Sequence, residues 1–366
     1  MYQDILNQLK ITKHQIKVFI STLLAIFLMM SLHYMGVPSP FKAKITHPAV
    51  QNKAEAATEE AMKKVRPQLQ KQKNDFKLKK ESRLFLPEAN AEELPATYDT
   101  ASGYIVADLE SGKILAGKNA DQHMPVASIT KIMTAIIALD LASPSEQITI
   151  TDNAAAYPPS KINVVPGEKM TLEELLNASL LASANDATES ILEGVNAKYK
   201  ADIFVRAMNE KAVLLGMKNT HFTNPQGFDF QDNGSSPADL AILTSYALKN
   251  YPLIAQIVQK DYQYLPANEY HHENNLYNWN GLIGVYPDTI GMKIGNTNAA
   301  GFTTTVVSNR GGKKLFAALL GAPGIRERDM WTAQLLDEAY KQAFNFDPIN
   351  ITEEQLQEKY DSWIIR

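Results

Sequence analysis

Cysteine is absent from the 366 residues of the chain, which excludes a disulfide framework and a thiolate metal site. An excess of charge of either sign is also missing. The 36 basic and 40 acidic residues give a net charge of −4, and the composition therefore gives no indication of nucleic-acid binding. No internal repeat is visible. What is present, 45% hydrophobic and 21% charged residues, is typical of a globular protein with one large domain or two small ones.

The N-terminus carries one long uncharged run. Residues 1–17 form a basic flank with Lys10, Lys13 and Lys17, and residues 18–37 contain no formal charge. A run of about 20 apolar residues can cross a bilayer, and a basic flank keeps its own side in the cytoplasm. We expect a single transmembrane signal-anchor at 18–37, with the rest of the chain on the extracytoplasmic side of the cell membrane. A cleaved signal peptide is the alternative, although no A-x-A site directly follows the run.

The remaining chain divides by composition into three parts. Residues 38–97 are rich in Lys, Glu, Gln and Ala without a sustained apolar stripe, which predicts a polar spacer, with a solvated helix as far as Pro67. A catalytic domain is expected over 98–345. The tail at 346–366 is too short for a further domain and is either a docking helix or a loose end.

Within 98–345 the strand patterns lie at both ends. Short strands are expected at 104–108 and 113–117 and again in "TIGMKIGNT", "AGFTTTVVSNRGG" and "KKLFAALLGAP", whereas helical patterns dominate from 128 to about 260. One antiparallel sheet closed by distant segments follows, with the helical middle as an insertion packed over one edge. A last helix is expected in "RDMWTAQLLDEAYKQAF".

The apolar segment "MPVASITKIMTAIIALDLA" reads as one helix and contains the first candidate chemistry. Ser128 and Lys131 lie three residues apart and share one helix face. Burial lowers the pKa of a lysine, and a neutral amine beside a hydroxyl is a base next to a nucleophile. Taken alone, S-x-x-K is a weak motif, because a capped helix with a snorkelling lysine gives the same pattern.

Two later motifs make the prediction of a catalytic serine more specific. Ser183 and Asn185 stand where an apolar helix breaks into a turn, and Lys293 and Gly295 stand on a strand that reads as buried. Separately they could be a helix cap and an edge charge. The order S-x-x-K, S-x-N, K-x-G is far more specific than any one part.

In these motifs the chain resembles the serine D-alanyl-D-alanine carboxypeptidases, low-molecular-weight penicillin-binding proteins related to serine β-lactamases. The resemblance runs from about residue 98 to 345 and includes "LLNASLLASANDAT", "GMKNTHFTNPQGF" and the closing strands. It implies an α/β (α+β type) fold with an antiparallel sheet of about five strands. It also implies removal of the terminal D-alanine from peptidoglycan stem peptides through an acyl-enzyme, covalent inhibition by β-lactam antibiotics, and no cofactor or metal.

The resemblance implies a role for each matching residue. Ser128 would be the acylated nucleophile and Lys131 the base for acylation. Ser183 would pass a proton toward the leaving D-alanine, while Asn185 would hold Lys131 and the substrate amide. Lys293 would support Ser183 and the substrate carboxylate.

The resemblance also implies which residues contact the substrate. The backbone N–H groups of Ser128 and Asn296 would form the oxyanion hole. An arginine of the last helix binds the terminal carboxylate in the family, and the spacing back from the two leucines at 335 and 336 favours Arg328 over Arg326.

One position departs from the family pattern. Ile294 stands where the family usually has the threonine of K-T-G, so the hydroxyl that would meet the substrate carboxylate is absent. Gly295 is retained and is expected to line the substrate site. Thr297, or a bidentate pair with Arg328, could take over the carboxylate.

Parts of the sequence suggest three alternative functions. A catalytically weak or inactive penicillin-binding scaffold on the same fold is suggested by Ile294. A β-lactamase is suggested by "EELLN" at 173–177, but this segment precedes the S-x-N motif and has helical periodicity. A zinc peptidase would need Glu269, His271 and His272 as ligands, without a further ligand set in view.

Overall fold

A computed structural model describes residues 48–71, 76–79 and 98–365 of the chain. The chain divides after Glu55, and a single compact unit extends from Ala56 to the C-terminus. Among the described residues, no helix combines the length and the apolar character that a membrane span needs. The signal-anchor expected at 18–37 lies outside the described residues.

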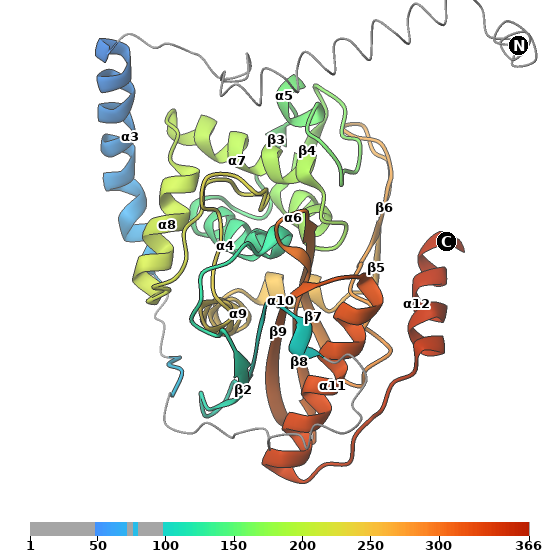
Figure 1. Ribbon diagram of the computed structural model, residues 1–366. Helices are drawn as coiled ribbons and strands as arrows, with labels where there is room; N and C mark the ends of the chain where they lie inside the picture. The colour runs from blue at the N-terminus through green and yellow to red at the C-terminus, as the bar shows by residue number, and fades with distance from the viewer. Residues whose placement is uncertain (1–47, 72–75, 80–97, 366) are drawn as a thin grey trace, which may run out of the picture. The chain divides into compact units, whose positions relative to one another are not determined.

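The central element is a five-stranded antiparallel sheet with the order β2-β1-β9-β8-β7 (Figure 1). Its strands are β1 (Gly103–Asp108), β2 (Ile114–Lys118), β7 (Thr289–Thr297), β8 (Gly301–Arg310) and β9 (Lys313–Ala322). Strands from both ends of the domain therefore meet in one sheet, and the predicted fold class is confirmed. Because β1 pairs with β9, the N-terminal hairpin is joined to the C-terminal strands.

Side chains alternate between the two faces of this sheet, as the two-residue period of a strand requires. In β1, Ile105 faces the larger hydrophobic core, whereas Tyr104 and Val106 face a second, smaller core. The smaller core is covered by α11 (Ile325–Phe344), which packs across the sheet in Figure 1. The sheet is thus buried between two helical layers.

The helical middle of the chain covers the other face. Its helices are α4 (Lys131–Leu141), α5 (Asp152–Ala155), α6 (Leu172–Leu180), α7 (Asn185–Tyr199), α8 (Phe204–Leu215), α9 (Pro237–Asn250) and α10 (Pro252–Val258). α9 contacts β1 and β9, which are central strands, so the expectation that the insertion packs over one edge is corrected to a face. Two small two-stranded antiparallel sheets accompany these helices, β3 (Gln147–Thr149) with β4 (Lys169–Thr171) and β5 (Tyr262–Leu265) with β6 (Asn274–Tyr277).

The spacer predicted for 38–97 is wrong for part of its length. Residues 48–69 form α3 (Pro48–Leu69), and in its part after residue 55 the side chains of Met62, Val65 and Leu69 are buried in the larger core. Arg66 adds ion pairs to Glu59 and to Glu210 of α8. Three apolar residues at helical spacing are too few to stand out in a charged sequence, yet they suffice to bury one helix face.

The C-terminal tail is a docked helix rather than a loose end. α12 (Glu353–Ile365) packs against α11, with Leu356 fully buried. The Tyr360 hydroxyl donates to Asp329 Oδ2 over 2.9 Å, and the rings of Trp363 and Trp279 meet edge to face. The tail therefore supports residues that adjoin the candidate site.

Candidate active site

The first motif lies in a turn before α4 rather than inside one continuous helix. Residues Ala127–Thr130 form a 3-10 turn, and α4 begins at Lys131. Ala127 has a φ of 51°, in the left-handed region. In a 3-10 turn, side chains three residues apart eclipse each other, so Ser128 and Lys131 still meet as predicted.

Lys131 is the centre of the polar contacts. Its Nζ lies 2.8 Å from each of three oxygens: Ser128 Oγ, Asn185 Oδ1 and the backbone carbonyl of Gln226. The amide and carbonyl oxygens can only accept, so Nζ donates to both of them. A neutral amine then has its lone pair left for the Ser128 hydroxyl proton.

The surroundings of Lys131 favour that neutral form. Its side chain is fully buried, and burial lowers the pKa of the amine well below its usual value. The positive charge of Lys293 lowers the pKa further, while the carboxylate of Asp186 opposes the shift. Ser128 and Lys131 together thus have the properties of a nucleophile and its base.

The second motif joins the first through its asparagine. Asn185 begins α7, and its amide donates to the carbonyls of Pro158 and Pro159, which orients Oδ1 toward Lys131. Ser183 is buried and has a φ of 58°. Among the described residues, no hydrogen bond joins the Ser183 hydroxyl to Ser128 or Lys131.

The third motif lies on β7, the edge strand of the sheet. Lys293 is almost fully buried, with Nζ 2.9 Å from the carbonyl oxygen of Ile294. Burial, with the nearby Arg328 guanidinium, lowers the pKa of Lys293 to about 7. Asn296, whose N–H is the second predicted oxyanion donor, follows Gly295 on the same strand.

Gly295 brings this strand against the nucleophile. A Cβ at position 295 would lie 2.7 Å from the Ser128 nitrogen and equally close to the Ala127 Cβ and the Thr303 Oγ1. No side chain fits in this space. The glycine therefore allows the edge of β7 to approach the backbone N–H of Ser128, as an oxyanion site built from both segments requires.

Arg328, the predicted partner of the substrate carboxylate, lies near Lys293, but part of its guanidinium is already paired with another carboxylate. Its charge lowers the pKa of Lys293, so the two cations lie within electrostatic reach of each other. However, Nε and Nη2 donate to the two carboxylate oxygens of Asp329, each over 2.7 Å, and Nη2 also lies 3.3 Å from the carbonyl of Trp279. A second bidentate carboxylate pair through the Nε edge is therefore excluded, and Nη1 is the part of the guanidinium that could meet a substrate.

Thr297 does not have the predicted orientation. Its hydroxyl donates to Asp229 Oδ1 over 2.7 Å and accepts from the N–H of Ala300 over 3.1 Å. These contacts close the turn between β7 and β8. Thr297 therefore does not replace the hydroxyl that is missing at Ile294, and this part of the prediction is wrong.

Sequence reasoning missed the contribution of the segment 224–228. The Gln226 carbonyl holds Lys131, and its side-chain amide donates to the buried Glu189 over 2.6 Å. Gly227 has a φ of 93°, and a Cβ there would lie 1.9 Å from the Ala127 carbonyl oxygen. The N-P-Q-G sequence marks a tight turn, but nothing in it predicts contact with a lysine nearly 100 residues earlier.

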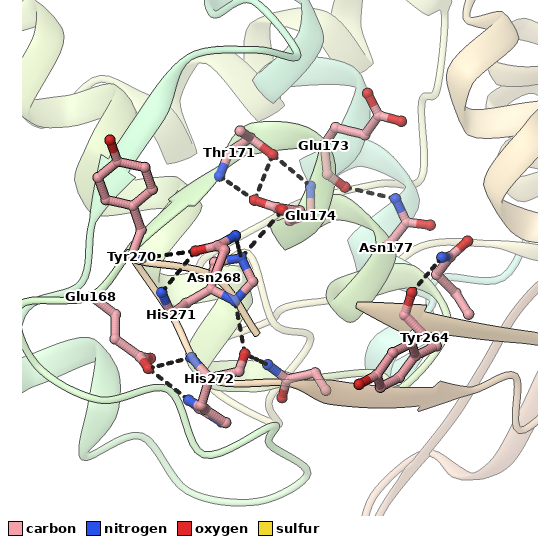
Figure 2. Close-up of polar contacts among 12 residues, drawn as sticks. Glu168, Thr171, Glu173, Glu174, Asn177, Tyr264, Asn268, Tyr270, His271 and His272 are labelled. Carbon is pink, nitrogen blue, oxygen red and sulfur yellow. Dashed lines mark hydrogen bonds and ion pairs between the residues drawn. The ribbon is translucent and has the colours of Figure 1, made fainter. Parts of the chain in front are cut away.

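Figure 2 shows the contacts of two of the three candidate zinc ligands, His271 and His272. His272 contacts Glu168 through Nδ1 at 2.7 Å, and His271 Nε2 lies close to Asn268 and Glu174. These contacts hold the loop after β5 against the start of α6. In the described part of the chain, no group of three or more potential ligands could hold a metal ion.

The β-lactamase-like segment lies in the same region. Residues 173–177 are helical, as their periodicity predicted, and belong to α6. Glu174 completes a capping box with Thr171, and Asn177 donates back to the Glu173 carbonyl (Figure 2). These residues stabilise a helix, and the resemblance to a deacylation loop is accidental.

The site combines a serine hydroxyl, a buried lysine of lowered pKa that is held by an asparagine, and a glycine-containing edge strand beside the serine N–H. This combination defines a serine enzyme of the acyl-transfer class with a lysine base. The model of the D-alanyl-D-alanine carboxypeptidases of peptidase family S11 matches residues 89–324, and the chain belongs to this family.

Individual relatives agree with this membership. The chain is 33% identical over 247 residues to the D-alanyl-D-alanine carboxypeptidase DacF of Bacillus subtilis, covering 66% of this chain and 62% of that protein. It is 34% identical over 231 residues to DacB2 of Mycobacterium tuberculosis, covering 62% and 77%. The crystal structure of the Streptomyces K15 DD-transpeptidase superposes with a TM-score of 0.62 at 26% identity, over 68% of this chain and 99% of that one. The match thus spans less than two thirds of the Bacillus relative.

Proposed function

We propose that the protein is a serine D-Ala-D-Ala carboxypeptidase that removes the terminal D-alanine from peptidoglycan pentapeptides and is acylated by penicillins. The observation that carries the proposal is the 2.8 Å contact between Lys131 Nζ and Ser128 Oγ in a fully buried setting. Family membership and the relatives named as carboxypeptidases support it. No cofactor takes part.

Acylation begins with the base. The neutral amine of Lys131 takes the Ser128 proton as Oγ attacks the carbonyl of the penultimate D-alanine. The N–H of Ser128, with that of Asn296, stabilises the oxyanion. Asn185 and the Gln226 carbonyl keep Nζ in place throughout, because both accept from it.

Two bond changes complete the turnover. The peptide C–N bond breaks, and the amine of D-alanine leaves with a proton that Lys131 delivers by way of Ser183. Water then attacks the ester carbonyl, the bond between that carbon and Ser128 Oγ breaks, and a proton from the water passes through Lys131 to Oγ, so that the shortened peptide leaves as a free acid. Lys293 and Arg328 provide the positive charge for the carboxylate of the leaving residue.

The test replaces the nucleophile. Ser128→Ala should abolish both D-alanine release from a D-Ala-D-Ala peptide and labelling by a fluorescent penicillin, with an unchanged melting temperature. Ser145→Ala, on an exposed turn, is the matched control and should behave as wild type. Full turnover by Ser128→Ala would refute the assignment, and a wild-type protein that neither releases D-alanine nor labels would favour the inactive scaffold.

We also propose that the enzyme is anchored in the cell membrane with its catalytic domain outside the cytoplasm. The support is the charge-free run 18–37 behind Lys10, Lys13 and Lys17. The full-length protein should fractionate with membranes, and deletion of residues 1–40 should release an active soluble enzyme. Full-length protein found free outside the cell would contradict the anchor.

A further inference from the structure

Glu189 is a buried carboxylate without a part in the proposed reaction steps. It lies on α7, four residues after Asn185, so the two side chains share one face of the helix. Its exposed fraction is 7%. A carboxylate in such a place is costly unless hydrogen-bond donors surround it. The donors around Glu189 therefore show what the residue does.

The main partner of Glu189 is the side chain of Gln226. Gln226 Nε2 donates to Glu189 Oε2 over 2.6 Å, and Gln226 is itself buried. Asn153 Nδ2 donates to the other carboxylate oxygen over 3.2 Å. Burial raises the pKa of Glu189, whereas hydrogen bonds from Gln226 and Tyr157 oppose this shift. Because an ionised carboxylate can only accept, it fixes the Gln226 amide with its nitrogen toward α7.

The same glutamine also holds the base. Its backbone carbonyl accepts from Lys131 Nζ over 2.8 Å, and Asn185 Oδ1 accepts from Nζ over the same distance. These two oxygens take the two N–H groups of a neutral amine, which leaves the lone pair for the Ser128 hydroxyl. Both acceptors therefore have to keep their positions for the base to face the nucleophile.

The position of the Gln226 carbonyl depends on the turn that contains it. The preceding Pro225 carbonyl accepts from the hydroxyl of Thr134 on α4 over 2.7 Å. This contact holds the neighbour of Gln226, whereas the hydrogen bond to Glu189 holds Gln226 itself. A shift of residue 226 away from Lys131 has to stretch or break that hydrogen bond.

We propose that Glu189 is a positioning residue for the base, because through the side chain of Gln226 it holds the carbonyl that accepts from Lys131. One face of α7 then sets both acceptors of the amine, Asn185 directly and Gln226 by way of Glu189. The inference rests on the proposed function, in which Lys131 is the base of acylation. Glu189 acts through Gln226 and not on the reacting atoms.

Glu193 on the same helix offers a matched comparison. It lies one turn after Glu189 and also accepts from Asn153, over 2.7 Å, and from the Thr151 hydroxyl. Both of these partners belong to the start of α5, with Thr151 as its N-cap. Replacement of Glu193 therefore perturbs the same helix, and a hydrogen-bond partner that Glu189 shares, without a change at Gln226.

The acid limb of the pH–rate profile separates positioning from a loss of stability. A hydrogen bond from an ammonium group is roughly twice as strong as one from a neutral amine, so an acceptor raises the pKa of Lys131. Displacement of the Gln226 carbonyl should lower that pKa and move the acid limb to lower pH. Lys293 and Asp186 are the charged groups that act on Lys131, and both are kept. A variant that only loses stability has less folded enzyme, with the limb unmoved.

The experiment measures acylation of the full-length protein by a fluorescent penicillin across pH, with urea unfolding of each variant alongside. Glu189→Leu removes the carboxylate, whereas Glu189→Gln removes the charge and keeps an acceptor for Gln226 Nε2. Gln226→Met removes the amide and keeps the backbone carbonyl, so it tests the same hydrogen bond even if Glu189→Leu does not fold. Glu193→Leu is the control.

We expect Glu189→Leu and Gln226→Met each to lose about tenfold or more in the second-order rate constant, since a misplacement of about 1 Å costs on the order of 100-fold. Both should move the acid limb to lower pH. The double variant should lose no more than the poorer single variant, because both changes break one hydrogen bond. Glu189→Gln should stay within about threefold of the wild type with an unmoved limb, since it keeps the acceptor. Glu193→Leu should match the wild type.

Other results would overturn the inference. If Glu189→Leu and Gln226→Met react at the wild-type rate, lose rate with an unmoved limb, or show additive losses in the double variant, Glu189 is purely structural. A limb that moves equally in Glu189→Gln would mean that the charge of Glu189, and not its hold on Gln226, acts on Lys131. Each of these outcomes leaves the proposed function standing. A wild type that is not acylated refutes the proposed function, and the positioning role with it.

Discussion

Substitution of Gly295 tests whether the position of Ser128 depends on the close approach of β7. In Gly295→Ala the new Cβ would lie 2.7 Å from Ala127 Cβ, Ser128 N and Thr303 Oγ1, whereas carbon atoms in contact prefer about 3.5–4.0 Å. Something must move by about 1 Å, and two of these three atoms belong to the turn that carries Ser128. A misplacement of that size costs on the order of 100-fold in rate. This corresponds to about 2.7 kcal/mol of activation free energy at about 1.4 kcal/mol per tenfold.

The assay is the second-order rate of acylation by a fluorescent penicillin, because it isolates the step in which Ser128 reacts. Urea unfolding should show a loss of about 1–3 kcal/mol in the free energy of unfolding, because the new methyl group overpacks the site. Gly117→Ala, on β2, is the matched control, since its Cβ would meet nothing closer than 3.4 Å. If Gly295→Ala reacts within threefold of the wild type, the turn and the strand are not coupled as argued here.

Two further predictions concern buried lysines. At falling pH, kcat/KM should decrease because the amine of Lys131 becomes protonated. Lys293→Met should move this acid limb of the pH–rate profile to higher pH, since the charge of Lys293 lowers the pKa of Lys131. An acid limb that does not move in the variant would contradict this coupling. Lys211→Met should destabilise the fold by about 3–5 kcal/mol in urea unfolding, because it leaves Asp140 as an unpaired buried charge. A loss below about 1 kcal/mol would mean that the pair at 2.8 Å contributes little.

The sequence predicted those features that depend on local pattern. The five strands follow the two-residue period, and the S-x-x-K spacing brought Ser128 and Lys131 together although the turn is 3-10 rather than α-helical. The resemblance to the family implied that Asn185 holds Lys131, and the structure has Lys131 Nζ 2.8 Å from Asn185 Oδ1. The motif and the contact have the same cause, because the N–H groups of a buried amine need hydrogen-bond acceptors.

Features that depend on residues far apart in the sequence could not be predicted from sequence patterns. The Gln226 carbonyl is a backbone group, and no side-chain motif reports where a backbone oxygen points. The resemblance implied a carboxylate-binding arginine on the last helix, and spacing favoured Arg328 over Arg326. Neither shows that the carboxylate of Asp329 already binds two nitrogens of Arg328. Thr297 was expected to face the substrate, yet Asp229, far away in sequence, accepts its proton.

The charges of the site explain why its parts must occur together. Lys131, Lys293 and Arg328 are all buried, and their like charges would repel one another in a medium of low polarity. The three groups differ in their surroundings. Arg328 is paired with the carboxylate of Asp329, burial and the charge of Lys293 lower the pKa of Lys131 well below its usual value, and the pKa of Lys293 falls to about 7. In the proposed reaction, a substrate carboxylate beside Lys293 would supply the missing negative charge and raise the pKa of that lysine, so that Lys293 stays protonated while Lys131 acts as the base. The anion that positions the leaving residue would then also complete the electrostatics of the site. Loss of Asp329 would then disturb catalysis even though no atom of it reaches Ser128.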